Sequence, residues 1–444
     1  MLLVWLLKSM ACGCAVALLL DCMLSYTSMS MSVVVCIYWW AHCCVFLMDV
    51  FFMFIMIFVC TALVATSAMH TVVAVCSAES NSMLLLQLMT CSLLVLIDDV
   101  LFFYWGFECL LLYMYMYLAI LQRTARAYYA LSMLAYYTIL GSALLLLGLS
   151  MQYAIAGHGS MKLLTSSACN SYRASVMYII LHIAFACKVP CWPLHSWLLQ
   201  AHSEASTDAS IILASLYLKV GIVGWAQYVL WRGSLLTWAL PIMVLATCYA
   251  CSTIGWILST TVDMKRFVAA CSVAHLHLCI CVMMCAHRSA SMVGLIVQVL
   301  MHSLIATLLF FVVGDVYEVQ GSRSIKSLRY GSSTSVSMLI LLLANSGFPC
   351  SASYYAEVSM LITTTTYSIA LTACIILIGA ILALAGGMFW VQVMTGRSKQ
   401  HPGIDTCNTS QATATTTLIL IVIIMSTWCT LAYINGLMTT NILL

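Results

Sequence analysis

Charged residues and prolines are both scarce in this chain. Only 7% of its 444 residues are charged, and five are proline. A typical globular domain is about one-quarter charged, and no segment here is polar enough to form a separate soluble domain. The net charge of +3 is not gathered into the basic runs that mark nucleic-acid binding, so no nucleic-acid partner is expected. The absence of a polar linker indicates one integral membrane domain over 1–444.

Hydrophobic residues, by contrast, make up 64% of the sequence, and the mean hydropathy is +1.09. They form continuous apolar runs of about 20 residues, the length of a membrane-spanning helix. A transmembrane β-barrel would instead show alternating segments of about ten residues. The 23 cysteines are scattered through these runs, where free thiols behave as small hydrophobic groups. The sequence therefore predicts an all-α polytopic membrane protein without a disulfide framework.

About fourteen transmembrane helices are expected. The runs lie near 2–24, 31–48, 50–78, 83–97, 99–121, 130–156, 174–198, 207–231, 235–261, 266–286, 291–317, 336–366, 367–395 and 413–437. The N-terminal stretch holds one basic residue, Lys8, and lacks the arginine- and serine-rich amphipathic character of an import presequence. It is interpreted as a first transmembrane helix of a bacterial or organelle-encoded product. The loops after the fifth, ninth, eleventh and thirteenth runs hold more lysine and arginine than the others, which puts them on the inner side.

Prolines interrupt two of the apolar runs. Pro190 and Pro193 fall in one, and Pro349 falls in another, with Glu357 eight residues further on. Paired interrupted helices indicate an ion site between two inverted repeats. The expected halves are 83–231 and 235–395, each with a proline-broken helix.

Three charged residues lie deep in apolar sequence: Glu108, Lys188 and Lys219. Such residues mark ion or proton paths by default. Burial disfavours a charged lysine and a nearby carboxylate favours it, so a lysine whose partner moves can pass on a proton. The simpler alternatives are a protonated Glu108 that only bonds a neighbouring helix and a Lys188 that extends its amine to the membrane surface.

Histidines and carboxylates accompany these lysines. His195 and His202 are seven residues apart on one expected helical face, which suits a proton relay. Glu204 is expected nearer a membrane surface, either in the path or at a solvated helix start. Further on, the TVDMKRF segment with Asp263 and Lys265 is typical of a solvated loop that opens a helix.

A metal or haem site is not expected. His275 and His277 lie near Cys271, Cys279 and Cys281, but these cysteines do not keep a helical ligand spacing. Two haems between two helices would need matching histidine pairs on both, and the chain has none.

Asp98 and Asp99 either cap a helix or lie at a water-filled entrance, and the sequence leaves both open.

The motifs over about 80–400 resemble the subunit 4 family of the antiporter-like membrane-arm subunits of mitochondrial NADH:ubiquinone oxidoreductase, respiratory complex I. The family pattern runs K-M-P, then L-H-x-W-L, A-H-x-E-A and L-K-x-G. The corresponding segments here are Lys188–Pro190, with Val189 in the place of the methionine, Leu194–Leu198, Ala201–Ala205 and Leu218–Gly221. GFECL resembles the family segment that carries a key glutamate, which falls on Glu108. TVDMKRFVAACSVAHL, LMHSLIATLLFF and LANSGFPCSASYYAEVSML resemble three later segments. The chain departs from the family at Leu199 and Ser206, where the family has prolines.

The resemblance implies proton translocation across the mitochondrial inner membrane, coupled to electron transfer from NADH to ubiquinone. Glu108 and Lys188 would form a switchable pair, and Lys219, His275, His302 and Glu357 would continue a path along the membrane midplane. The chain would hold no redox cofactor, because FMN, the Fe–S clusters and ubiquinone would be bound by other subunits. Its partners would be lipids and other membrane-arm subunits, including antiporter-like neighbours. The alternative is a subunit of a multisubunit cation/proton antiporter.

Overall fold

The computed structural model describes residues 99–121, 124–159, 172–229, 240–285, 289–327, 332–349 and 351–395, with isolated positions between 83 and 97. The expected spans before residue 83 and at 413–437 lie outside the described residues, as does Asp98.

The described chain is helical, as the composition predicts. Its elements are α5 (Val100–Leu121), α6 (Ala125–Ala156), α8 (Tyr172–Lys188), α9 (Ser196–Glu204), α10 (Thr207–Ile212), the π-helix η2 (Leu213–Tyr217), α11 (Leu218–Val229), α12 (Leu240–Thr260), α13 (Met264–Cys285), α14 (Ser289–Gln320), the 3-10 turn η4 (Ile325–Ser327), α15 (Ser332–Asn345), α16 (Ala352–Tyr367) and α17 (Ile369–Thr395). The described residues form no β-strand, and Asp263 and Ser324 make an isolated antiparallel bridge.

Six helical stretches in the described part are long and apolar enough to cross a membrane. They are Val100–Ile120, Ala125–Ile155, Thr207–Ala226, Met264–Cys285, Gly294–Glu318 and Ile369–Gln392. The chain is therefore a multi-pass membrane protein. The total of fourteen helices and the inverted repeats stay predictions.

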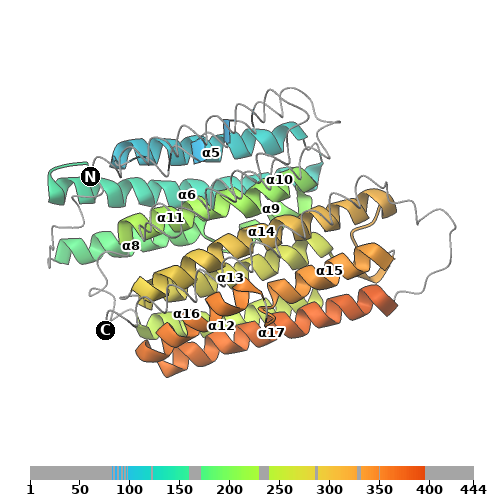
Figure 1. The fold of residues 1–444 in the computed structure, drawn as a ribbon. Coiled ribbons are helices and arrows are strands. Elements are labelled where there is room, and N and C mark those ends of the chain that lie inside the picture. The colour runs from blue at the N-terminus through green and yellow to red at the C-terminus, as the bar shows by residue number, and fades with distance from the viewer. Residues whose placement is uncertain are drawn as a thin grey trace, which may run out of the picture.

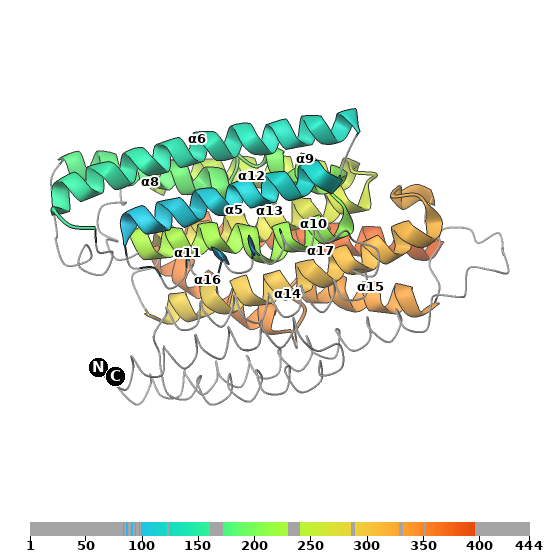
Figure 2. The ribbon, with the colours of Figure 1, turned by 90° about the horizontal axis from the view of Figure 1, so that it is seen from above.

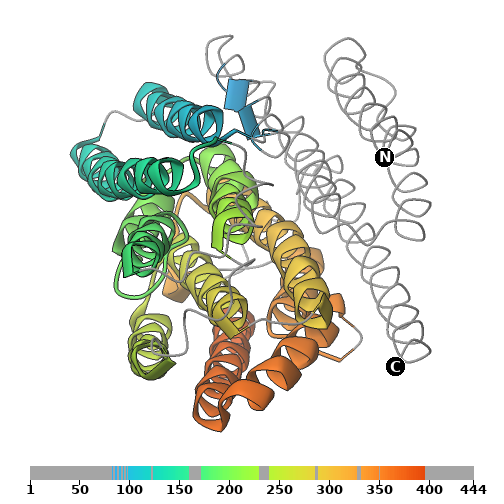
Figure 3. The ribbon, with the colours of Figure 1, turned by 90° about the vertical axis from the view of Figure 1, so that its left-hand side faces the viewer.

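The long helices run alongside one another, with α5 and α6 at one edge and α12 and α17 at the other (Figure 1). From above, α14 lies on the opposite side of the bundle from α6 (Figure 2). In the end-on view the green and yellow helices from the middle of the sequence lie between the blue-green and the orange ones (Figure 3). The span windows of Thr207–Ala226 and Gly294–Glu318 are fully buried, whereas that of α5 is 33% buried. We call the two fully buried spans, together with the 94% buried span Met264–Cys285, the buried row. Its residues are shielded from lipid, and a polar side chain is tolerated there if it finds a partner.

Asp99 caps α5. Its Oδ1 accepts hydrogen bonds from the backbone N of Leu101 (2.8 Å) and Phe102 (3.3 Å). A carboxylate at this position satisfies amides that have no partner inside the helix. Of the two interpretations open for Asp99, the structure therefore shows the cap.

The two runs that the sequence predicts to be interrupted by proline are both broken there. α8 ends at Lys188 and α9 begins at Ser196, with a cis bond between Trp192 and Pro193. Trp197 Nε1 donates to Cys187 O across this break (3.1 Å).

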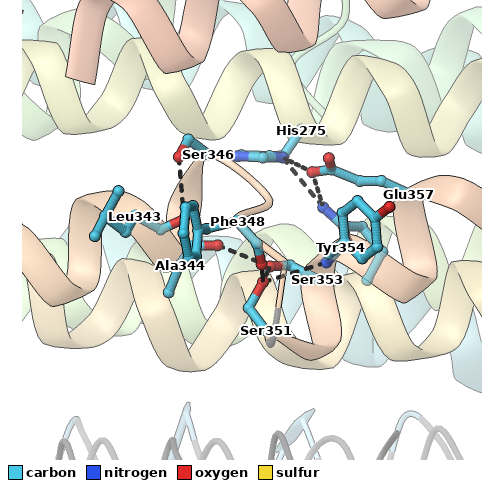
Figure 4. A network of polar contacts seen from close by, with 10 residues as sticks. His275, Leu343, Ala344, Ser346, Phe348, Ser351, Ser353, Tyr354 and Glu357 are labelled. Carbon is cyan, nitrogen blue, oxygen red and sulfur yellow. Dashed lines mark hydrogen bonds and ion pairs between the residues drawn. The ribbon is translucent and has the colours of Figure 1, made fainter. Parts of the chain in front are cut away.

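The second break lies between α15 and α16, and serines supply its missing hydrogen bonds. Ser353 Oγ donates to Ala344 O (2.7 Å), and Ser351 Oγ donates to Phe348 O (2.7 Å). Figure 4 shows these side chains gathered at the break. Side-chain hydrogen bonds of this kind replace the missing helical ones and allow a helix to be interrupted at membrane depth.

A third irregularity was not expected from the sequence. Between α10 and α11 the chain makes the π-helix η2, so the Thr207–Ala226 span is continuous but locally widened. π-turns of this kind occur frequently at functional sites. This one ends two residues before Lys219.

Candidate functional site

Lys219 lies in the middle of the buried row, with 1% of its surface exposed. Its Nζ contacts His302 Nδ1 on α14 (3.1 Å) and donates to Ala214 O on the π-helix (2.5 Å). Ala214 lies within the π-helix η2, five residues before the lysine. A buried ammonium needs such partners, because an isolated charge in an apolar interior is strongly unfavourable.

Two histidines continue from Lys219. The rings of His302 and His275 have centroids 5.4 Å apart, and they come from neighbouring helices α14 and α13. Both residues are 3% exposed. His302 thus links Lys219 to His275.

Glu357 follows His275 at the second helix break. His275 Nδ1 lies 3.6 Å from Glu357 Oε1, and Gln298 Nε2 reaches both His275 Nδ1 (3.1 Å) and Glu357 Oε1 (3.3 Å). Figure 4 shows His275 and Glu357 facing each other beside the interrupted segment. Glu357 is 19% exposed, so it is the most accessible member of this group.

The interrupted segment approaches Glu357 closely. Gly347 has φ +65°, and a Cβ added there would collide with Glu357 Oε2 and lie 3.0 Å from its Cδ. Glycine is the residue that adopts this backbone conformation without strain and leaves the space open. The break therefore positions the carboxylate as well as ending the helix.

The set Lys219, His302, His275 and Glu357 is thus brought together by four elements. We name this contact series the central chain, and Gln298 bridges its last two members. Its groups are lysine, histidine and carboxyl, which bind and release protons, and histidine can receive a proton on one ring nitrogen while releasing one from the other. The arrangement can pass protons in both directions along the row.

Lys188 lies beside the central chain of Lys219, His302, His275 and Glu357 and makes no direct contact with it. Its Nζ donates to the Tyr217 hydroxyl (2.6 Å) and lies over the rings of Tyr217 (3.8 Å) and Phe107 (4.4 Å). Such rings attract a cation. Tyr217 is the last residue of the π-helix, so the same irregularity serves both lysines.

Glu108 is partly buried on α5, and the described residues contain no ion pair between it and Lys188. It is close enough to act electrostatically on the lysine, and its Oε1 is a buried atom without a hydrogen-bond partner in this part of the chain. The expected pair is thus near but separated, with Tyr217 holding Lys188.

His195 and His202 have different surroundings, although they are seven residues apart. His195 is the N-cap residue of α9 and acts electrostatically on His277, whose Nδ1 lies 3.2 Å from Cys191 Sγ. His202 is fully buried and stacks on Phe310 of α14, with ring centroids 4.5 Å apart. Their joint relay stays a prediction.

The interpretation of Lys265 as a solvated loop residue is wrong. Asp263 does open α13, since its Oδ1 accepts from Lys265 N (2.9 Å). The Lys265 side chain, however, is only 2% exposed and donates to Ala205 O (2.8 Å). The segment after α14 pairs with the chain at the start of α13: Met264 N donates to Arg323 O, and Ile325 N donates to Val262 O. The sequence around Lys265 is polar, but the side chain is buried where the segment after α14, which we call the strap, packs against the start of α13.

Sequence reasoning also missed Tyr217 and Gln298. Gln298 lies four residues before His302, so the two share a face of α14. A polar side chain at that spacing from a histidine in an apolar helix was the available signal.

Glu204 ends α9 and is partly buried. Among the described residues, no group of three or more His, Cys, Asp or Glu is arranged to hold a metal ion.

Comparison with known proteins identifies relatives. The chain is 31% identical to NADH-ubiquinone oxidoreductase chain 4 of Acanthamoeba castellanii over 274 residues, which are 60% of this chain and 54% of that protein. It is 28% identical to the chain 4 protein of Marchantia polymorpha over 281 residues, 60% of this chain and 54% of the relative. NADH-quinone oxidoreductase subunit M of Rickettsia felis is 29% identical over 272 residues, 58% of this chain and 54% of that protein. The matches span about half the length of these curated relatives.

Solved structures share the fold. The Mrp complex from Dietzia sp. superposes with a TM-score of 0.75 at 16% identity, covering 86% of this chain and 82% of the other. The membrane-bound sulfane sulfur reductase, an archaeal respiratory membrane complex, gives 0.74 at 16% identity, covering 86% and 81%. The family model described as NADH:quinone oxidoreductase/Mrp antiporter, TM, matches residues 98–383, and the chain belongs to this family of antiporter-like membrane proteins.

Proposed function

We propose that the chain translocates protons across the mitochondrial inner membrane as a membrane-arm subunit of an NADH:ubiquinone oxidoreductase. The observation that carries the proposal is the central chain, in which proton-binding groups from Lys219 to Glu357 follow one another through a buried row. Charged or titratable residues are costly at this depth and are kept where they move ions or protons.

Within this scheme Lys188 is the mobile group. When Lys188 pairs with Glu108 the two charges attract, and when it turns to Tyr217, as in this structure, that attraction is weakened. At about 4 Å and an effective dielectric constant of about 20, an ion pair is worth roughly 4 kcal/mol. Moving one charge against about 180 mV costs roughly 4 kcal/mol, from about 2.3 kcal/mol per 100 mV. Opening the pair is therefore on the scale of one transport step.

Electron transfer takes place in other subunits under this proposal. Two of the relatives are named as chain 4 of NADH-ubiquinone oxidoreductase, and one as subunit M of an NADH-quinone oxidoreductase. FMN, Fe–S clusters and ubiquinone would be bound by those other subunits, and charge changes there would reach this chain through an antiporter-like neighbour at the Glu108 side. The fourteen helices, two inverted repeats and organelle encoding belong to the same proposal.

A subunit of a multisubunit cation/proton antiporter is the second candidate, favoured by the fold shared with the Mrp complex. The two are separated by what co-purifies with the chain. Flavin and Fe–S proteins in the assembly support the first, and a complex without them supports the second.

The test is proton pumping by the assembled complex in proteoliposomes, measured as protons moved per NADH oxidised. Lys219→Met and Glu357→Gln should lower this ratio and the coupled rate while leaving the amount of assembled complex unchanged. The matched control is Lys326→Met, which removes an exposed lysine from η4. A wild-type ratio in Lys219→Met would overturn the proposal.

A further inference from the structure

Two thiols meet at the edge of the bundle formed by α12 and α17, away from the central chain. The Sγ atoms of Cys248 on α12 and Cys374 on α17 are 3.1 Å apart. Cys251, about one turn further along α12, donates its Sγ to the backbone oxygen of Cys374 (3.2 Å). All three are free cysteines, and the proposed proton path uses none of them.

The packing of α12 against α17 holds the two sulfur atoms in register. The helices are also close at Gly255, where an added Cβ would lie 3.4 Å from Ile381 Cδ1. Gly255 and Ile381 each come seven residues after Cys248 and Cys374 respectively, which is about two turns on either helix. The two helices therefore run side by side in the same direction. A disulfide needs its sulfur atoms about 2.0 Å apart, so the thiols need to approach by about 1 Å.

The thiol pair faces outward from the bundle. Cys248 is exposed and Cys374 is partly exposed, and the neighbouring Leu245 and Ile376 are 60% and 55% exposed. The span window of α17 is 33% buried, so most of this helix faces away from the protein interior. Apolar side chains exposed on a membrane-spanning helix contact lipid, and the thiols are therefore open to reagents dissolved in the lipid.

The depth of the pair selects the kind of oxidant that reaches it. Cys248 lies eight residues after the first residue of α12, about 12 Å along the helix at 1.5 Å per residue. The hydrocarbon layer of a membrane is about 30 Å thick, so this depth lies within it. Glutathione disulfide carries charges that are costly there. A lipid hydroperoxide carries its O–O bond on a molecule that is already part of the membrane.

We propose that Cys248 and Cys374 form a reversible oxidation site, at which a lipid hydroperoxide converts the two thiols to a disulfide. The sulfur of Cys248, the more exposed of the two, attacks one oxygen of the peroxide. The O–O bond breaks, the lipid leaves as its alcohol with the thiol proton, and Cys248 becomes a sulfenic acid. The sulfur of Cys374 then attacks that of Cys248, the S–O bond breaks, and the hydroxyl leaves as water with the second thiol proton. The two thiols thus supply the two electrons that reduce the peroxide, and a dithiol reductant restores them.

The disulfide would tie together two helices that each contact the structure of a helix break. On α12, Tyr249 follows Cys248 and stacks on Trp192 of the first break, with ring centroids 5.3 Å apart and the planes 9° from parallel. On α17, Thr372 donates its hydroxyl to Thr364 of α16 (3.1 Å), the helix that follows the second break. Closing the disulfide therefore restricts the movement of one break relative to the other and slows proton pumping. This consequence rests on the proposed function, whereas the disulfide itself does not.

The experiment identifies the bond directly. The assembled complex in liposomes is treated with linoleic acid hydroperoxide in the lipid, its remaining thiols are alkylated, and its peptides are analysed by mass spectrometry. The peptides that hold Cys248 and Cys374 should be joined by a disulfide, which dithiothreitol should remove. In Cys374→Ser the sulfenic acid of Cys248 should persist and be trapped by dimedone. Recovery of both cysteines as alkylated free thiols in the treated wild type would overturn the site, as would a disulfide formed by aqueous glutathione disulfide but not by the lipid hydroperoxide.

Two serine variants are matched controls. Cys251→Ser keeps a donor for the backbone oxygen of Cys374, and Cys109→Ser removes a partly exposed thiol from α5 at the other edge of the bundle. Both should still form the disulfide. Treatment should lower the protons moved per NADH further in the wild type than in Cys248→Ser, and dithiothreitol should abolish that difference. An equal loss in both, with the disulfide formed in the wild type, would overturn the restriction of the breaks, and the proposed function would stand if Lys219→Met still abolishes pumping by this subunit.

Discussion

Gly347 is the position where one added methyl group should disable the central chain. Its φ of +65° costs an alanine about 1–2 kcal/mol. The new Cβ would also meet the Glu357 carboxyl group, whose Cδ would be 3.0 Å away. Because that carboxyl is the end of a flexible side chain, it would move rather than the backbone. Its hydrogen bond from Gln298 and its contact with His275 would then be lost.

Gly321 provides a matched control. It also has φ +65°, but a Cβ there would meet nothing within 4 Å. Gly321→Ala should therefore cost only the backbone strain of about 1–2 kcal/mol. Gly347→Ala should cost the same strain plus a hydrogen bond to the carboxyl, about 1.5–3 kcal/mol where the carboxyl is charged.

The assay is the ratio of protons moved per NADH in proteoliposomes, with the quantity of assembled complex measured beside it. Gly347→Ala should lower the ratio to the level of Glu357→Gln, and Gly321→Ala should leave it at the wild-type value. Equal ratios in the two glycine variants would refute the reasoning, because strain alone would then account for every effect.

Two further predictions concern single hydrogen bonds. Tyr217→Phe keeps the ring over Lys188 but removes the hydroxyl that accepts a hydrogen bond from its amine. Losing a hydrogen bond to a charged group costs about 1.5–3 kcal/mol, so the coupled rate should fall several-fold with assembly unchanged. An unaltered rate would show that this hydrogen bond does not hold the lysine. Asp99→Ala should destabilise α5 by about 1 kcal/mol, seen as a lower thermal midpoint of the assembled complex, whereas Asp99→Asn should stay near the wild type; equal losses in both would rule out the cap.

Helix positions could be predicted from the sequence because apolar length determines them. The run expected at 266–286 is α13 at Met264–Cys285, and the run at 207–231 is the Thr207–Val229 series. The breaks followed from proline, which lacks an amide donor and clashes with the preceding turn. These are properties of short stretches of chain, so they can be read without the fold.

Lys265 and the π-helix could not be predicted, because both depend on distant contacts. Lys265 is buried by the strap after α14, some sixty residues away, through the bonds of Arg323 and Ile325 to the start of α13. The stretch Leu213–Tyr217 has no local signal for a π-turn. Within the central chain, Lys219 and Glu357 stand out in the sequence itself, whereas the place of His275 and His302 in the path comes from the family resemblance. The roles of all four residues stay predictions.

The two central lysines differ in how they are held, and the difference suits them to different tasks in the proposed proton path. Lys219 has two partners, His302 Nδ1 and Ala214 O. If it gives a proton to His302, the neutral amine still donates to Ala214 O, so the side chain stays in place while the proton moves. Lys188 has one hydrogen-bond partner in the described residues, the Tyr217 hydroxyl, and Glu108 lies nearby. A cation with a single neutral partner and an accessible carboxylate has two alternative positions. Lys219 is thus suited to a fixed relay and Lys188 to a moving switch, and the π-helix between them supplies one partner to each.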